Sequence, residues 1–123
     1  MLYEINDIGG ASKLDWILRI MNENKQKELD KVVVENINTP GRTSNVNAVK
    51  YYAMKTAFLE ILPESSPGLT QKEIQQKVKK KLSQDVFPNG EKSAWWAKTV
   101  QLDLEAKGIV IRENTKPLAW YKR

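Results

Sequence analysis

Two residue types are absent from the chain, and each absence excludes a class of site. The 123 residues include no cysteine and no histidine. Without cysteine there is no disulfide and no thiolate metal site. Without histidine there is no Ser-His-Asp triad, no histidine general base and no zinc site that needs imidazole. We therefore expect no cofactor and no metal, and we predict that the chain is not an enzyme.

Long apolar segments are also missing. No apolar run approaches the roughly 20 residues that a helix needs to cross a bilayer. The first ten residues, MLYEINDIGG, lack the basic start and the apolar stretch of a secretory signal. Together with the lack of cysteine, these observations predict a cytoplasmic protein with no membrane partner.

The residues that are present have the composition of an ordinary folded protein. Hydrophobic residues make up 41% of the chain and charged residues 28%, which argues against wholesale disorder. A chain of this length is most economically one domain with an appended arm. We assign residues 1–35 to an N-terminal helical arm with a short strand, and residues 36–123 to the main domain. The turn at Pro40-Gly41 marks the boundary region.

The net charge of +5 is concentrated in two blocks. Residues 70–82 carry five lysines and one glutamate, and residues 107–123 carry five basic side chains and one glutamate. Two basic blocks permit an anionic partner such as nucleic acid. Solvated lysines on a helix surface and a charged C-terminus explain the same pattern, so both interpretations stay open.

The segment 46–62 has the broadest apolar face in the chain and is predicted to form the helix at the centre of the core. Asn45 or Asn47 is expected to cap this helix. Val49, Tyr51 and Tyr52 are among its expected core residues.

Other local signals place the remaining elements. Thr70 and Glu73 form a capping box that begins a helix continuing to about Leu82. Gly108 is the C′ residue expected after the last helix. The further expected elements are helices at 12–31 and 91–107 and strands at 32–34, 109–111 and 118–121.

Three helices followed by a β-hairpin resemble the winged helix-turn-helix arrangement. The stretch GLTQKEIQQKV (68–78) resembles the start of a helix-turn-helix. The stretch VQLDLEAKGIVIRE (100–113) resembles the junction between a recognition helix and its wing. The resemblance covers residues 46–123. It implies a mainly α fold with a small β-hairpin, that is, an α+β winged-helix domain, here with an N-terminal helical arm.

A narrower resemblance covers residues 32–123. The stretches that carry it are NINTPGRT (36–43), VFPNG (86–90), WWAKTVQLDLEAKG (95–108) and KPLAWYKR (116–123). They look like a family of small bacterial proteins with no assigned function. This likeness supports the fold and adds no chemistry.

The winged-helix resemblance implies a set of nucleic-acid contacts. In winged-helix proteins that bind DNA, the third helix enters the major groove and the wing contacts the backbone or the minor groove. Lysines on the preceding helix reach phosphates, which release counterions when they are neutralised. The implied contact residues are Lys72, Lys79, Lys80, Lys81, Lys92, Ser93, Lys98, Thr99, Arg112 and Lys116.

The outward face of helix 91–107 does not have the composition of a DNA-reading face. At about 100° per residue, one arc that includes Trp96 is expected to pack in the core. A second arc, centred on Trp95, Thr99 and Leu102, is where such a helix would face the groove, and it is largely apolar. Gln101, Glu105 and Asp103 belong to the polar strips between the arcs.

Three interpretations of Trp95 and Leu102 stay open. The N-terminal arm covers them, they form a surface for a homodimer or a protein partner, or Trp95 stacks on a base or inserts into DNA. The arm residues that would cover them are Leu14, Ile17, Leu18 and Met21.

The predicted function is a non-enzymatic binding module, a small DNA-binding protein of the transcription-regulator type that contacts duplex DNA and forms a homodimer. The alternative is a winged-helix module for protein–protein contact or dimerisation that binds no nucleic acid. No small-molecule substrate is expected.

Overall fold

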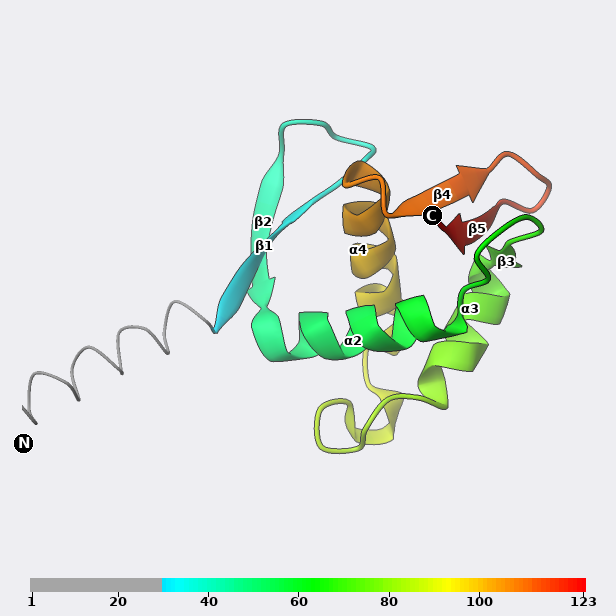
Figure 1. Cartoon of the computed structure of the whole chain (residues 1–123). Helices are drawn as coiled ribbons and strands as arrows, with labels where there is room; N and C mark the ends of the chain where they lie inside the picture. Colours follow the sequence, from blue (N-terminus) through cyan, green and yellow to red (C-terminus); the bar gives the residue numbers. More distant parts are fainter. Residues whose placement is uncertain (1–29) are drawn as a thin grey trace, which may run out of the picture. The chain divides into compact units, whose positions relative to one another are not determined.

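The computed structural model describes residues 30–123. Over this range the chain forms three α-helices and two small antiparallel sheets (Figure 1). In chain order the elements are β1 (Lys31–Glu35), β2 (Thr43–Asn47), α2 (Ala48–Ile61), β3 (Leu69–Thr70), α3 (Gln71–Lys79), the 3₁₀ turn η2 (Pro88–Gly90), α4 (Ser93–Ala106), β4 (Val110–Glu113) and β5 (Ala119–Lys122). The α+β class predicted from the sequence is confirmed. None of the helices in this part of the chain is long and apolar enough to cross a bilayer.

The predicted arm lies almost wholly outside the described residues, and so do its apolar residues Leu14, Ile17, Leu18 and Met21. A compact unit spans Val32–Arg123. Strand β1, which the sequence grouped with the arm, pairs with β2 of this unit. The compact unit therefore starts a few residues before the expected boundary at 35/36.

Helix α2 lies at the centre of the core, as predicted. Asn47 Oδ1 accepts a hydrogen bond from the backbone N–H of Lys50 at 2.9 Å, and this contact caps the first turn. The core face carries Tyr51, Met54 and Phe58, which are at most 2% exposed. Packed against it are α3 and α4.

Two α2 residues assigned to the core from the sequence are on its outer side. Val49 is 64% exposed and Tyr52 is 53% exposed. At 100° per residue they project more than a right angle away from the arc of Tyr51 and Met54. The prediction that they are core residues is wrong, because the apolar arc of this helix is wider than the face that its neighbours cover.

Helix α3 begins at the predicted capping box. The backbone N–H of Thr70 donates to Glu73 Oε1 at 2.9 Å, and Thr70 Oγ1 accepts from the backbone N–H of Glu73 at 3.3 Å. The helix ends at Lys79 rather than near Leu82. Lys80 and Lys81 therefore lie in the turn that follows it.

The C-terminal sheet has the strand order β3-β5-β4 with antiparallel pairing. Leu69 pairs with Trp120, and Ile111 pairs with Tyr121. Gly68 lies directly against β5, because a Cβ at this position would be 2.3 Å from the Trp120 carbonyl oxygen. Only glycine fits there, so the approach of β3 to β5 depends on this residue.

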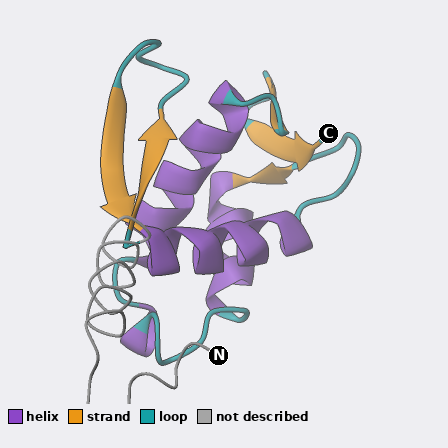
Figure 2. Ribbon diagram, turned by 60° about the vertical axis from the view of Figure 1, so that its left-hand side comes forward, coloured by secondary structure: helices purple, strands orange, loops and turns teal. Residues whose placement is uncertain are grey.

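The N-terminal sheet consists of β1 and β2, which run in opposite directions beside α4 (Figure 2). Val34 of β1 is 5% exposed and belongs to the core, and Val46 of β2 packs against it. The sequence placed residues 36–45 in a loop. In the structure the loop is shorter, because β2 begins at Thr43. We call β1, β2 and their connection the N-terminal hairpin.

Candidate functional site

Helix α4 begins without a side-chain cap. Its N-cap residue, Lys92, has a left-handed backbone with φ 58° and makes no capping hydrogen bond. The turn before it also bends through positive φ, at Asn89 and Gly90. The first N–H groups of α4 therefore have no side-chain acceptor at the cap, and the positive end of the helix dipole lies there.

A hollow of about 370 Å³ lies between α3 and the first turn of α4. We call it the lysine groove. It brings together three exposed lysines, and none of the residues within 30–123 that line it is acidic. The lining residues are Lys72, Gln75, Gln76, Lys79, Gly90, Lys92, Ser93 and Ala94.

Ser93 lies at the floor of the lysine groove. It was predicted to contact DNA from the helix surface, but it is only 4% exposed. Its Oγ makes no hydrogen bond to any other described residue. The helix surface here is formed by its neighbours Lys92 and Ala94, which are both exposed. Ser93 therefore offers a recessed hydroxyl rather than a surface contact.

A second hollow of about 630 Å³ lies between the N-terminal hairpin and the outward face of α4. We call it the hairpin cleft. The α4 wall carries four residues that the sequence singled out, and the opposite wall carries Arg42, which the sequence did not. The lining residues are Val34, Glu35, Asn36, Thr39, Arg42, Thr43, Ser44, Val46, Trp95, Lys98, Thr99 and Leu102.

Trp95 lies at the edge of this cleft and packs against other aromatic rings. Its ring lies edge-on to that of Trp96, with centroids 5.0 Å apart, and Trp96 lies edge-on to Phe87 at 6.4 Å. Trp96 and Phe87 are buried, while Trp95 is 54% exposed. The side predicted for each tryptophan is confirmed: Trp96 packs in the core and Trp95 points outward.

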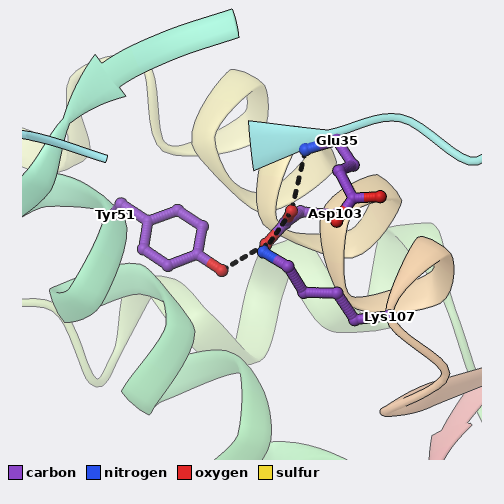
Figure 3. A network of polar contacts seen from close by, with 4 residues as sticks. All are labelled: Glu35, Tyr51, Asp103 and Lys107. Atoms are coloured by element: carbon purple, nitrogen blue, oxygen red, sulfur yellow. Dashed lines mark hydrogen bonds and ion pairs between the residues drawn. The ribbon is translucent and has the colours of Figure 1, made fainter. Parts of the chain in front are cut away.

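A buried carboxylate links the end of β1, beside the hairpin cleft, to α4 (Figure 3). Asp103 of α4 is fully buried, and its Oδ1 accepts a hydrogen bond from the backbone N–H of Glu35 at 2.8 Å. Its Oδ2 accepts from the Tyr51 hydroxyl. Lys107 Nζ donates to both oxygens, at 2.7 and 2.8 Å. One carboxylate therefore joins the end of β1, α2 and the last turn of α4.

The hydrogen-bond network around Asp103 was not predicted from the sequence. Asp103 and Gln101 were assigned to the polar strips of α4 between its two arcs, yet they are 0% and 1% exposed. Burial, together with the hydrogen bond to Asp103 and the charge of that carboxylate, raises the pKa of Tyr51 well above its usual range. The available signal was the i, i+4 spacing of Asp103 and Lys107, but nothing local identifies Tyr51 and Glu35 as their partners.

Arg112, predicted to contact DNA from the wing, forms an ion pair within the domain. Its Nη2 donates to Glu105 Oε1 at 3.2 Å, and its Nε lies 3.0 Å from Glu105 Oε2 without hydrogen-bond alignment. Trp120 Nε1 donates to the same Glu105 Oε1 at 2.9 Å, and the guanidinium lies 5.8 Å from the Trp120 ring centre. The Arg112 charge is therefore balanced internally.

Three further predicted contacts lie apart from both hollows. Lys80 and Lys81 are exposed after α3, and Lys116 is exposed between β4 and β5. None of them lines the lysine groove or the hairpin cleft.

The two hollows present cations, hydroxyls and an aromatic ring. Among residues 30–123 no three acidic side chains come together in a way that would hold a metal ion. Ammonium groups at an uncapped helix start favour anions such as phosphates. An exposed indole provides a surface for stacking.

A family model described as "Family of unknown function (DUF6958)" matches residues 31–120. The matched range begins at β1 and ends within β5, so it includes both hollows. No curated protein and no solved structure matches the chain.

Proposed function

The chain belongs to the DUF6958 family of unknown function, and we propose that it is a non-enzymatic, winged-helix binding module that contacts nucleic acid. The order of elements supports the winged-helix assignment: α2, α3 and α4 are followed by the β4–β5 hairpin, with the short β3 between the first two helices. In DNA-binding proteins of this arrangement, the third helix is the one that approaches the nucleic acid.

The lysine groove carries the proposal. Lys72 and Lys79 of α3 and Lys92 at the start of α4 line one hollow, and the described part of the chain adds no acidic residue to that lining. Their charges add to the positive end of the α4 dipole. Neutralising a phosphate at this point releases condensed counterions, which is the main source of sequence-independent affinity for nucleic acid.

The N-terminal hairpin determines which kind of contact α4 can make. The major groove is about 12 Å wide and admits one α-helix or one two-stranded ribbon, and a helix with its side chains is already about 10–12 Å across. With the hairpin lying along the Trp95–Leu102 face, α4 is too broad to enter the groove with that face. We therefore propose phosphate contacts at the start of α4, which position the protein and convey little sequence information.

The test is binding of a mixed-sequence duplex over a range of salt concentrations, measured by fluorescence anisotropy. The variant is the pair Lys72→Glu and Lys79→Glu. We expect affinity to fall at least about tenfold, and the slope of log K against log salt to flatten by about 2, since each lost phosphate contact contributes about 0.9.

The matched control is the pair Lys31→Glu and Lys55→Glu, which makes the same change in net charge at two lysines that line neither hollow. This control should retain most of the affinity. If both pairs weaken binding equally, the lysine groove has no special role. If the unmodified protein shows no binding at low salt, the proposal fails.

A second function, protein–protein contact or homodimerisation, is supported by a separate observation. Val49 and Tyr52 lie three residues apart on the outer side of α2, and both are more than half exposed. Neighbouring exposed apolar side chains favour an interaction surface. Light scattering of the unmodified protein and of the double variant Val49→Ser and Tyr52→Ser measures the oligomeric state. A dimer that dissociates in the variant supports this function. A protein that is monomeric at all concentrations excludes dimerisation.

A further inference from the structure

We propose that the hairpin cleft binds an unpaired nucleic-acid strand, with one base stacked on Trp95 and the flanking phosphates held between Arg42 and Lys98. This inference rests on the proposed function and specifies the form of nucleic acid that occupies the outward face of α4. It also assigns a role to the exposed tryptophan and to the hairpin that stands opposite it.

The first support is the arrangement of charge. Arg42 on the hairpin and Lys98 on α4 line opposite walls of the cleft, and Glu35 is the one acidic residue that the structure describes in its lining. The cleft is thus positive on balance and can hold a strand by its phosphates from two sides. Hydroxyl groups of Thr39, Ser44 and Thr99 lie among these charges and supply hydrogen bonds that do not depend on sequence.

The second support is the state of Trp95. More than half of its surface is exposed, and its ring packs edge-on against the buried Trp96. A preorganised aromatic surface loses little conformational freedom when a base stacks on it. Aromatic side chains beside a basic groove are the usual means by which proteins hold single strands, because every base has a π face.

The third support is the size of the cleft. A volume of about 630 Å³ falls within the roughly 300–1,000 Å³ of pockets that enclose small ligands. This is the scale of a base with its sugar and phosphate, whereas a duplex cannot pass between the hairpin and α4. The same hairpin that keeps α4 out of a major groove therefore provides the second wall of a site for an unpaired strand.

The cleft and the lysine groove are lined by neighbouring residues of α4. Ser93 and Ala94 line the groove, and Trp95 and Lys98 line the cleft, so the two hollows flank the same first turns of α4. A strand whose phosphates lie on the lysines of α3 passes over the start of α4 to reach Trp95. One strand can therefore occupy both hollows.

The experiment compares the full chain with Trp95→Leu and Trp95→Phe. The probes are an oligothymidylate of about ten nucleotides, a length within the range of single-strand sites, a duplex of equal length, and an abasic oligonucleotide with the same number of phosphates. Affinity is measured by anisotropy, stacking by quenching of tryptophan emission, and folding of each variant by circular dichroism.

The oligothymidylate should bind more tightly than the duplex and should quench tryptophan emission. Trp95→Leu should weaken its binding by about 5- to 150-fold, the range for loss of one stacked base. Trp95→Phe should restore most of the affinity. The unmodified protein should bind the abasic probe more weakly than the oligothymidylate, because the abasic probe has phosphates and no base. For the same reason, all three proteins should bind the abasic probe with equal affinity.

Two results would overturn the inference and leave the proposed function standing: a folded Trp95→Leu variant with unchanged affinity for the oligothymidylate, or a clear preference for the duplex. Absence of binding to every probe would instead overturn the proposed function together with the inference. Weakening of single-strand binding by the pair Arg42→Ala and Lys98→Ala would support the placement of the phosphates, and its absence would contradict it.

Discussion

The carboxylate of Asp103 accepts a hydrogen bond from the phenolic hydroxyl of Tyr51, and this contact joins α4 to α2 inside the core. The same carboxylate also binds the backbone N–H of Glu35 and the ammonium of Lys107. A buried charge is tolerated only when it is paired and hydrogen-bonded. The position of the N-terminal hairpin beside α4 is therefore tied to the stability of the core.

Removing this carboxylate should destabilise the domain more than removing any one of its partners. Asp103→Ala leaves the Tyr51 hydroxyl and the Glu35 amide without an acceptor, and we expect a loss of about 3–5 kcal/mol in the free energy of unfolding. Tyr51→Phe removes a single hydrogen bond to a charged group and should cost about 1.5–3 kcal/mol. Urea unfolding followed by circular dichroism measures both values. An Asp103→Ala variant as stable as Tyr51→Phe would show that the carboxylate is not the centre of the network.

Tyr51 should also make the domain sensitive to alkaline pH. Burial and the neighbouring carboxylate raise the pKa of this phenol above its ordinary value of 10.0. The folded chain therefore keeps a proton that the unfolded chain releases. The resulting stabilisation is fully present below about pH 10 and is lost as the pH rises further, at a rate of at most about 1.4 kcal/mol per pH unit.

The measurement for this prediction is the free energy of unfolding at several pH values above 9. Tyr51→Phe should remove this part of the alkaline decline. Tyr52→Phe is the matched control, since its ring is exposed on the same helix, and it should decline as the unmodified protein does. Identical slopes for the two variants would contradict the assignment to Tyr51.

Arg112 should contribute to stability and not to nucleic-acid binding. Its guanidinium is paired with Glu105, which also accepts the Trp120 indole N–H. Arg112→Met keeps the apolar stem of the side chain and removes the charge. We expect lower thermal stability and an affinity for duplex within about twofold of the unmodified protein, because a charge that is already balanced within the domain releases few counterions. A large loss of affinity without a loss of stability would contradict this expectation and support the contact between Arg112 and DNA that the sequence predicted.

The elements that could be predicted from the sequence are those with local signals. Helix α2 follows from its periodicity, and the start of α3 follows from the capping box at Thr70 and Glu73. Gly108 ends α4 as expected, with a positive φ of 74°. Each of these signals lies within a few residues of the structure that it specifies.

The elements that could not be predicted depend on distant partners. Strand β2 has the sequence TSNVN, with one apolar residue, so its strand character comes from pairing with β1. The burial of Asp103 depends on Tyr51, 52 residues earlier in the chain. Trp95 and Lys98 could be selected from helix geometry, but the second wall of their cleft, including Arg42, is formed by the hairpin and has no local signal.

The backbone of Glu35 should control the hairpin cleft independently of the Glu35 side chain. Its N–H donates to Asp103 Oδ1, so Glu35→Pro removes the contact that fixes the end of β1 to α4. Proline is compatible with the end of a strand and with an extended residue before it. Glu35→Ala keeps the N–H and is the matched control.

We expect Glu35→Pro to lower the free energy of unfolding by about 1–3 kcal/mol, because one buried acceptor loses its donor, whereas Glu35→Ala should change it by less than about 0.5 kcal/mol. Hydrogen exchange should increase in residues 31–47 of the proline variant and stay unchanged in α2. Its affinity for an unpaired strand should fall, since Arg42 is no longer held opposite Lys98. If exchange in the hairpin is the same in both variants, the Asp103 contact does not hold the hairpin against α4, and the width of the cleft must be set by the packing of Val34 and Val46 instead.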